Sequence, residues 1–332
     1  MKRNILKFIC GMGLVCGLWS CESGDQSFPD YEGGTTVYFP YQYPVRTIVL
    51  GDAEQSIDLT NDHAHKCEIQ ATFGGSYNGS NGSVTVAVDE TLCNNLFFED
   101  GVTPVKAMPS SYYQLSTTTL DFNGSMIGKT VVQLTDAFFN DPDAVKETYV
   151  IPLVMTGQTG FGKILTGSLN EGQSGPRTDE SVWDVKPMDY VLYCVKYINK
   201  YSGVWLTHGT TSTEDIESAG TVEINTLSLN TCLYSVSYQD GDQIYKADLK
   251  LSFDGSEKCT ISSLTDGVTA SGSGSWGDNS EKKAWGNRDR DGMELNYTVD
   301  FGGGKVFSTH EKMVWQRNGV KAIDPFLPVY VK

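Results

Sequence analysis

Two tryptophans in a polar part of the chain are the residues whose type and spacing best suit ligand binding. Trp276 and Trp285 lie in the segment Gly274–Asn287, which is otherwise rich in glycine, serine, asparagine, aspartate and lysine. Flat aromatic rings stack on the apolar face of a sugar, and neighbouring amides such as Asn287 bond its hydroxyl groups. The segment therefore predicts a carbohydrate platform at Trp276, Trp285 and Asn287. The alternative is that each tryptophan caps the core of a folded domain.

A second aromatic candidate lies in the first half of the chain. Tyr77 and Asn78 occur in the turn-rich run Gly74–Gly82, which predicts a long hairpin tip. We expect this pair to be a weaker ligand-binding candidate than the tryptophans.

The residues that follow Trp285 resemble the start of a calcium loop. Asn287, Asp289 and Asp291 place oxygen ligands at alternate positions, and Gly292 stands at the sharp turn. The twelfth position is Thr298 where a bidentate glutamate is needed, and two arginines would crowd the cation. Asp-Gly between strands is also an ordinary hairpin signal. We therefore expect no metal and no cofactor, with these three residues as weak calcium candidates.

Other catalytic or metal-binding patterns are weak or missing. His63, His65 and Cys67 alternate and would share one face of a strand, but they follow a turn and are better explained as a strand start. There is no Gly-x-Ser-x-Gly elbow and no phosphate-binding loop, and His310-Glu311 lacks a second metal-binding histidine. The sequence therefore predicts a non-enzyme. A glycosidase stays open, because paired carboxylates leave little trace in one sequence.

The N-terminus predicts a lipid anchor. Met1 to Arg3 with Lys7 is basic, Ile5–Leu18 is apolar but short for a membrane span, and Leu18-Trp19-Ser20 precedes Cys21. We expect residues 1–20 to be a lipoprotein signal peptide, Cys21 to carry acyl chains that enter the bilayer, and residues 21–33 to form a tether. An ordinary cleaved signal followed by a chance cysteine is the alternative.

Composition limits the partners and the role of the cysteines. The net charge of −16 becomes −19 when the leader's Lys2, Arg3 and Lys7 are removed, which disfavours nucleic acid. The mature chain is long enough for two domains. Its remaining cysteines are odd in number and widely spaced, which indicates small buried side chains with Cys232–Cys259 as one possible bridge. They are Cys67, Cys93, Cys194, Cys232 and Cys259.

Short runs rich in Val, Thr, Tyr and Phe, separated by Gly, Asn, Asp and Ser, predict an all-β protein. Residues 34–156 predict an immunoglobulin-like β-sandwich with one short helix near Glu90, for which Asp89 would be the N-cap. Residues 157–188 are rich in glycine, serine and threonine and indicate a linker or long excursion. Residues 189–332 predict a hairpin-linked antiparallel meander that closes as a lipocalin-like barrel or forms a sandwich.

Several stretches resemble a family of Bacteroides-type cell-surface lipoproteins of unknown function, which have an adhesin-like N-terminal domain and are found among glycan-utilisation genes. The stretches are Tyr38–Thr47, Pro109–Tyr113, Tyr149–Leu153 and Asp189–Asn199, and Glu22–Gln26 is similar to lipoprotein export signals. The resemblance implies a lipid-anchored protein on the exterior of the outer membrane. It also implies binding of an extracellular polysaccharide or oligosaccharide beside an outer-membrane glycan importer. The alternatives are an adhesin or accessory subunit that docks a protein and, more weakly, a glycan hydrolase.

Overall fold

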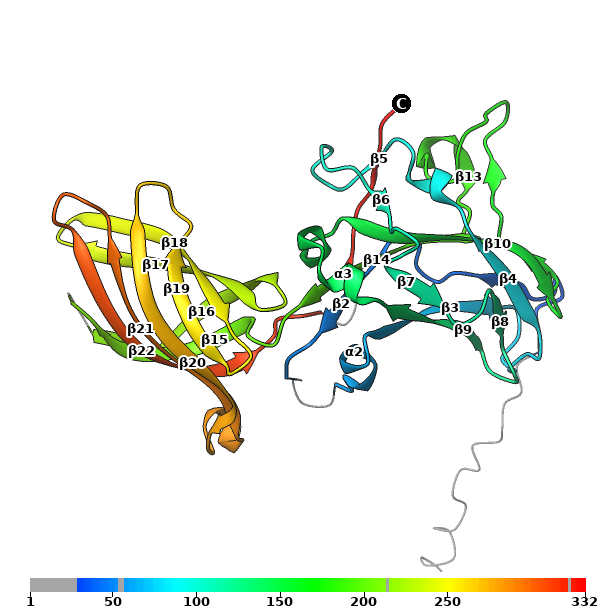
Figure 1. The fold of residues 1–332 in the computed structure, drawn as a ribbon. Helices are drawn as coiled ribbons and strands as arrows, with labels where there is room; N and C mark the ends of the chain where they lie inside the picture. The colour runs from blue at the N-terminus through cyan, green and yellow to red at the C-terminus, as the bar shows by residue number, and fades with distance from the viewer. Residues whose placement is uncertain (1–28, 53–56, 213–214, 322–323) are drawn as a thin grey trace, which may run out of the picture.

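Strands dominate the fold, as the sequence predicts. The computed structural model describes residues 29–52, 57–212, 215–321 and 324–332, so the predicted signal peptide and Cys21 lie outside the described residues. A two-sheet sandwich precedes a closed antiparallel barrel (Figure 1). The all-β prediction is therefore confirmed, and the C-terminal meander takes the barrel form of the two that the sequence left open.

The sandwich consists of a five-stranded sheet in the order β11-β1-β3-β9-β7 and a seven-stranded sheet with the path β23-β2-β14-β10-β4-β8, where β6 also pairs with β10. The first sheet contains β1 (Thr36–Tyr38), β3 (Lys66–Gly74), β7 (Tyr113–Leu115), β9 (Ile127–Leu134) and β11 (Lys163–Ile164). The second contains β2 (Pro44–Val49), β4 (Ser83–Val88), β6 (Lys106–Ala107), β8 (Thr119–Asp121), β10 (Tyr149–Thr159), β14 (Tyr190–Ile198) and β23 (Asp324–Pro325).

Alternating side chains form the core between these sheets. In β3, Cys67, Ile69 and Phe73 are buried, whereas Glu68 and Gln70 point outward. This period of two is the pattern of a strand with one covered face. Short helices fill the connections: α2 (Thr60–His63), η1 (Glu90–Cys93), α3 (Asp136–Phe139), η2 (Pro142–Val145) and η3 (Glu180–Val182). The predicted cap is present, because the Asp89 side chain accepts a hydrogen bond from the Thr91 backbone N–H.

The domain boundary lies later than the sequence predicts. Strand β14, which we expected to begin the second domain, pairs with β10 and β2 inside the sandwich. Val191 and Val195 join the core between the sheets, and Leu192 and Cys194 join a smaller core on the opposite face. A strand that is covered on both faces has a continuous apolar sequence, and such a sequence does not indicate which domain the strand belongs to.

The predicted linker is an ordered excursion that stays with the sandwich. It contains β11 and the paired strands β12 (Ser168–Leu169) and β13 (Trp183–Val185). The Arg177 guanidinium donates to both carboxylate oxygens of the fully buried Asp189 at 2.9–3.1 Å. This ion pair ties the excursion to the start of β14.

The barrel runs from β15 to β22, and β22 pairs with β15 to close it. Its strands are β15 (Gly203–Thr211), β16 (Asp215–Ser228), β17 (Thr231–Asp240), β18 (Gln243–Phe253), β19 (Lys258–Ser263), β20 (Thr269–Glu281), β21 (Arg290–Asp300) and β22 (Val306–Arg317), with η4 (Trp285–Asn287) between β20 and β21. Its core side chains include Trp205, Leu249, Leu295 and Trp315. Gly272 lets β20 approach β21, because an added Cβ would lie 2.4 Å from the Cβ of Tyr297.

After the barrel, the chain returns to the sandwich, and Figure 1 shows this segment in red. β23 pairs with β2, and β24 (Val329–Tyr330) pairs with β5 (Leu96–Phe97). Between them, Phe326 is 4% exposed and its ring packs on those of Tyr43 and Phe98. The C-terminal residues, which the sequence assigned to the second domain, therefore belong to the first.

All five described cysteines are free, so the possible Cys232–Cys259 bridge is not formed. Among the described residues, no helix has the length and apolar character needed to cross a membrane.

Candidate functional site

The predicted tryptophan platform is divided between two environments. Trp276 lies on β20 and packs against the barrel core, with its ring edge-on to Tyr201 and the Lys200 Nζ 4.4 Å from its centre. Its indole nitrogen is buried without a hydrogen-bond partner. Trp285 lies in η4 and keeps 48% of its side-chain surface exposed. Trp276 thus occupies the core-capping position given as the alternative, and Trp285 is the exposed ring of the two.

The calcium-loop candidates do not converge on one point. Asp289 accepts hydrogen bonds from the Lys282 Nζ at 2.9 Å and the Lys283 backbone N–H at 3.1 Å. Asp291 is 2% exposed and accepts from the Asn279 backbone N–H at 2.8 Å. Asn287 closes the η4 turn with a positive φ of 57°. Two of the three side chains therefore have other partners, and Asp291 belongs to a different group of acids.

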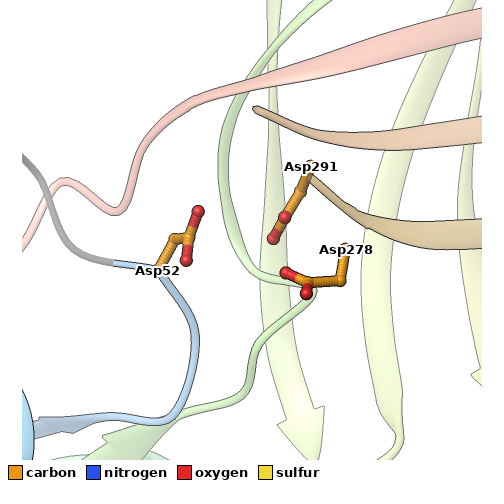
Figure 2. A group of neighbouring side chains, drawn as sticks. All are labelled: Asp52, Asp278 and Asp291. Atoms are coloured by element: carbon orange, nitrogen blue, oxygen red, sulfur yellow. The ribbon is translucent and has the colours of Figure 1, made fainter. Parts of the chain in front are cut away.

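That group joins the two domains. Asp52 comes from the loop after β2, and Asp278 and Asp291 come from β20 and β21 of the barrel. Their carboxylate oxygens lie within 4.8 Å of one another, and Figure 2 shows them turned toward a common point. We call these three residues the acidic junction. The acidic junction could not be predicted from the sequence, because Asp52 and Asp278 lie far apart in the chain.

Burial controls the charge of the acidic junction. Desolvation raises the pKa of Asp291 to about 7, and the neighbouring Asp52 and Asp278 carboxylates add to the rise. The pKa of Asp52 is raised mainly by burial and by Asp278, against the opposing effects of Arg290 and Arg288. One carboxyl of the group therefore holds a proton well above the usual range for aspartate.

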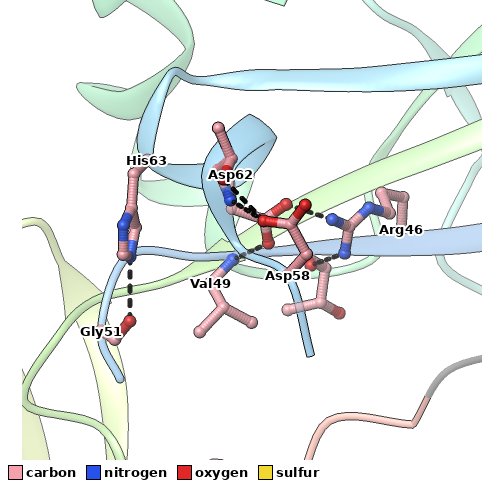
Figure 3. Close-up of polar contacts among 8 residues, drawn as sticks. Arg46, Val49, Gly51, Asp58, Asp62 and His63 are labelled. Carbon is pink, nitrogen blue, oxygen red and sulfur yellow. Dashed lines mark hydrogen bonds and ion pairs between the residues drawn. The ribbon is translucent and has the colours of Figure 1, made fainter. Parts of the chain in front are cut away.

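A polar network joins the end of β2, next to Asp52, to helix α2 (Figure 3). Asp62 of α2 is fully buried, pairs with Arg46 and accepts from the Val49 backbone N–H at 2.8 Å. The His63 Nε2 lies 3.0 Å from the Gly51 carbonyl oxygen. These contacts tie Val49 and Gly51 to α2. An added Cβ on Gly51 would lie 2.8 Å from the Lys200 Cα, so Gly51 sits directly against the connection into the barrel.

His63, His65 and Cys67 do not form a metal site in the structure. His63 faces Gly51, while His65 has a positive φ of 57° and packs its ring 4.2 Å from that of Phe139. Cys67 is 2% exposed, and burial raises its thiol pKa to about 12. The three side chains thus serve different parts of the sandwich.

A cavity of about 400 Å³ opens at one edge of the sandwich. β1 pairs with β3 across Thr72–Gly74, and the chain then crosses toward β2. The earlier part of β3 therefore does not have β1 beside it, and the cavity lies there. We call it the sandwich pocket. Apolar wall residues are Pro44, Val45, Cys67, Ile69 and Val191, and polar or aromatic ones include Tyr41, Arg46, Asn61, Glu68, Gln70, Tyr193 and Asp324.

The polar groups of the sandwich pocket are held in place. Glu68 accepts from the Lys129 Nζ at 2.7 Å and from the Gln70 amide at 3.2 Å. Tyr41 keeps 50% of its surface exposed on the turn that leads into β2. Ligand pockets commonly combine an apolar floor with a few fixed polar groups, at volumes of about 300–1,000 Å³. No pocket was predicted at these residues from the sequence, because the pocket takes its walls from distant segments.

The hairpin tip predicted at Gly74–Gly82 is not formed, because β3 and β4 lie in different sheets and this segment connects the two sheets. Tyr77 follows β3 and is 73% exposed, and the Asn78 backbone N–H donates to the Ser76 Oγ at 3.1 Å. They are far along the chain from the tryptophans and belong to the sandwich.

Comparison with known proteins matches each of the two domains to a family model. A family model described as "Domain of unknown function (DUF5627)" matches residues 200–319, and a model described as a "-like, N-terminal domain" matches residues 31–162. A Bacteroides ovatus protein of unknown function, with a crystal structure at 2.40 Å resolution, is 33% identical. The match covers 91% of this chain and all of that one, with a TM-score of 0.82.

Two other Bacteroides ovatus structures are more distant. One is a multidomain protein including DUF1735, 13% identical over 84% of this chain and 93% of its own, with a TM-score of 0.41. The other is a protein of unknown function, 10% identical over 84% of this chain and 90% of its own, with a TM-score of 0.39. No curated protein matches the chain.

Proposed function

The chain belongs to the family of the 33%-identical Bacteroides ovatus protein, and we propose that it is a lipid-anchored surface protein that binds an extracellular glycan without catalysis. The observation that carries this proposal is the sandwich pocket. Its volume of about 400 Å³ suits a small part of a saccharide chain.

The chemistry of the sandwich pocket fits a sugar. The exposed Tyr41 ring offers a face on which a pyranose ring can stack, and the Gln70 amide and Glu68 carboxylate offer hydrogen bonds to hydroxyl groups. The buried Cys67 supplies an apolar wall, because its raised pKa keeps the thiol neutral. A mixed lining of this kind binds polyhydroxylated molecules better than it binds purely apolar ones.

The predicted anchor determines where this binding would take place. Acyl chains on Cys21 would tether the protein to the outer membrane, and the sandwich is the first domain after the tether. We propose that the protein faces the cell exterior and presents the pocket to polysaccharide, in association with an outer-membrane glycan importer.

Binding of the soluble chain, begun after Cys21, to an array of host and dietary polysaccharides tests the proposal. We expect Tyr41→Ala and Gln70→Ala to weaken binding by about tenfold, since each removes roughly 1.4 kcal/mol of contact. Gln114→Ala is the matched control, because Gln114 is an exposed strand glutamine outside the pocket. Absence of glycan binding would overturn the proposal in favour of an adhesin or accessory subunit that docks a protein.

The acidic junction favours glycan hydrolysis as a second candidate function. A glycosidase needs one carboxyl that holds a proton near neutral pH and a second carboxylate nearby. Asp291, with its pKa of about 7, and the exposed Asp278 supply such a pair. Release of reducing ends by the soluble chain, abolished in Asp278→Asn, would support hydrolysis, and no release from any bound glycan would exclude it.

A further inference from the structure

Two exposed tyrosines flank a hollow at the other end of β1 and β3. Tyr31 is 70% exposed and Tyr77 is 73% exposed, although most large aromatic side chains of the sandwich are buried. Both line a hollow of about 550 Å³. Its other walls come from small, uncharged or apolar residues, namely Pro29, Gly34, Thr36, Gly74, Gly75 and Ser76.

Backbone contacts hold the two tyrosine-bearing loops together. The Tyr31 N–H donates to the Gly75 carbonyl oxygen of the other loop at 2.8 Å, and within its own loop the Tyr31 carbonyl oxygen accepts from the Gly34 N–H at 2.9 Å. Gly75 has a φ of +96°, and an added Cβ there would lie 2.5 Å from the Gly34 oxygen. The glycines therefore permit a close approach that fixes the spacing of the two tyrosines.

The residues that line the hollow indicate which class of ligand it would bind. They include no carboxylate, amine, guanidinium or imidazole group. The Tyr31 and Tyr77 rings can stack on the apolar face of a sugar ring, and Ser76 and Thr36, which also line the hollow, carry hydroxyl groups. These features suit an uncharged pyranose ring and offer nothing to hold a phosphate, a nucleic acid or a metal ion.

The hollow and the sandwich pocket border the same pair of strands. Thr36 of β1 lies at the hollow, and the turn after β1 carries Tyr41 into the pocket. Along β3, Gln70 lines the pocket and Gly74 lines the hollow, which at roughly 3.3 Å per residue separates them by about 13 Å. A single saccharide chain of a few residues can span this distance.

We infer that Tyr31 and Tyr77 form a second subsite, which stacks on an uncharged sugar ring of the same glycan chain that the sandwich pocket binds. This inference rests on the proposed function. Because the subsites share one chain, the second contributes to binding only when the saccharide is long enough to reach it.

Calorimetric titration with neutral oligosaccharides of increasing length, made from the polysaccharide that the array selects, tests this inference. We expect Tyr31→Ala and Tyr77→Ala each to raise the Kd for long oligosaccharides by about tenfold and to leave the Kd for the shortest bound one unchanged. Tyr77→Phe is the matched variant, and it should keep most of the affinity because the ring remains. Unchanged melting temperatures would show that the variants fold.

The outcomes separate this inference from the proposed function. If Tyr41→Ala weakens binding and the Tyr31 and Tyr77 variants do not, the second subsite is overturned and the proposed function stands. Equal losses in Tyr77→Phe and Tyr77→Ala would also overturn the stacking role. If wild-type protein binds no saccharide, both the proposed function and the second subsite are overturned.

Discussion

The barrel and the sandwich close their cores in different ways. The barrel pairs β22 with β15, so every strand has two neighbours, and its interior is filled by large side chains and the buried Glu311 carboxylate. The sandwich leaves a pocket at one edge and relies on a distant segment, β23 to β24, to cover a smaller core. Closure thus makes the barrel self-contained, while the open edges of the sandwich leave a pocket and make this domain depend on the C-terminus.

The largest expected effect comes from removing the aromatic ring that holds the C-terminal segment. Phe326→Ala should destabilise the sandwich by about 3–5 kcal/mol, because it leaves a cavity beside Tyr43 and Phe98. Thermal unfolding followed by calorimetry should show a lowered sandwich transition and an unchanged barrel transition.

The neighbouring residue provides the control. Leu327 is 60% exposed, so Leu327→Ala should change the free energy of unfolding by less than about 0.5 kcal/mol. Equal lowering of both transitions in Phe326→Ala would show that the barrel is not self-contained, and the contrast between the domains would fail.

The buried carboxylate of the barrel gives the next effect. Glu311 is 1% exposed and accepts hydrogen bonds from the hydroxyls of Thr207, Tyr234 and Tyr297 at 2.9–3.1 Å. Glu311→Ala should destabilise the barrel by about 2–4 kcal/mol, because buried hydroxyls lose their acceptor. Chemical denaturation measures this change.

Glu311→Gln is the conservative variant for the same position. Burial raises the pKa of Glu311, and a glutamine amide keeps the shape of the side chain and one oxygen that accepts hydrogen bonds from the hydroxyl groups. We expect a clearly smaller loss than in Glu311→Ala. A loss of stability as large as that in Glu311→Ala would mean that the hydroxyl groups stabilise the ionised carboxylate.

The acidic junction joins residues of the two domains, and its contribution to stability should depend on pH. The pKa of Asp291 is raised from 3.8 to about 7, so its native-state proton stabilises the fold at low pH, and this contribution is lost as the pH rises from about 4 to 7. Asp291→Asn cannot lose a proton. We therefore expect its melting temperature to fall less than that of wild type between about pH 5 and pH 7.5.

Asp289 is the matched control for this pH experiment. It is exposed, and its hydrogen bond with Lys282 lowers its pKa, so it stays ionised throughout that range. Asp289→Asn should leave the pH dependence unchanged. A pH dependence that is identical in wild type and Asp291→Asn would contradict the proton assigned to the junction.

The smallest expected effect is at a surface ion pair beside the sandwich pocket. Lys129 and Glu68 lie 2.7 Å apart, but the lysine side chain is 54% exposed. Lys129→Ala should cost about 0–1 kcal/mol of stability, as solvated pairs do. A larger loss in chemical denaturation would indicate that Glu68 is important for the fold as well as for the pocket.

The local sequence pattern was sufficient to predict elements that depend on neighbouring residues. Alternation along β3, the Asp89 cap and the glycine-containing hairpins of the barrel could be predicted, because each depends on residues close in the chain. The boundary between the domains could not be predicted in this way. β14 is apolar on both faces, and only its pairing with β10 and β2 shows that it belongs to the sandwich.

The residues of the candidate sites likewise include some that local sequence could predict and some that it could not. The exposure of Tyr77 was predictable from its turn-rich surroundings, but its partner Tyr31 was not, because a backbone hydrogen bond across distant segments brings the two together. Asp291 attracted attention as part of a calcium-like motif. Its actual neighbours, Asp52 and Asp278, come from another domain and another strand.

The all-β class, the order of sandwich and meander, and the acidic character that disfavours nucleic acid could be predicted from composition and from periodicities of a few residues. The family resemblance came from particular stretches such as Tyr38–Thr47. Closure of the meander as a barrel, the return of the C-terminus to the sandwich and the residues that line the pocket became known from the tertiary structure alone. The physical reason is that strand pairing and cavities depend on contacts between segments far apart in the chain, which local side-chain preferences do not encode.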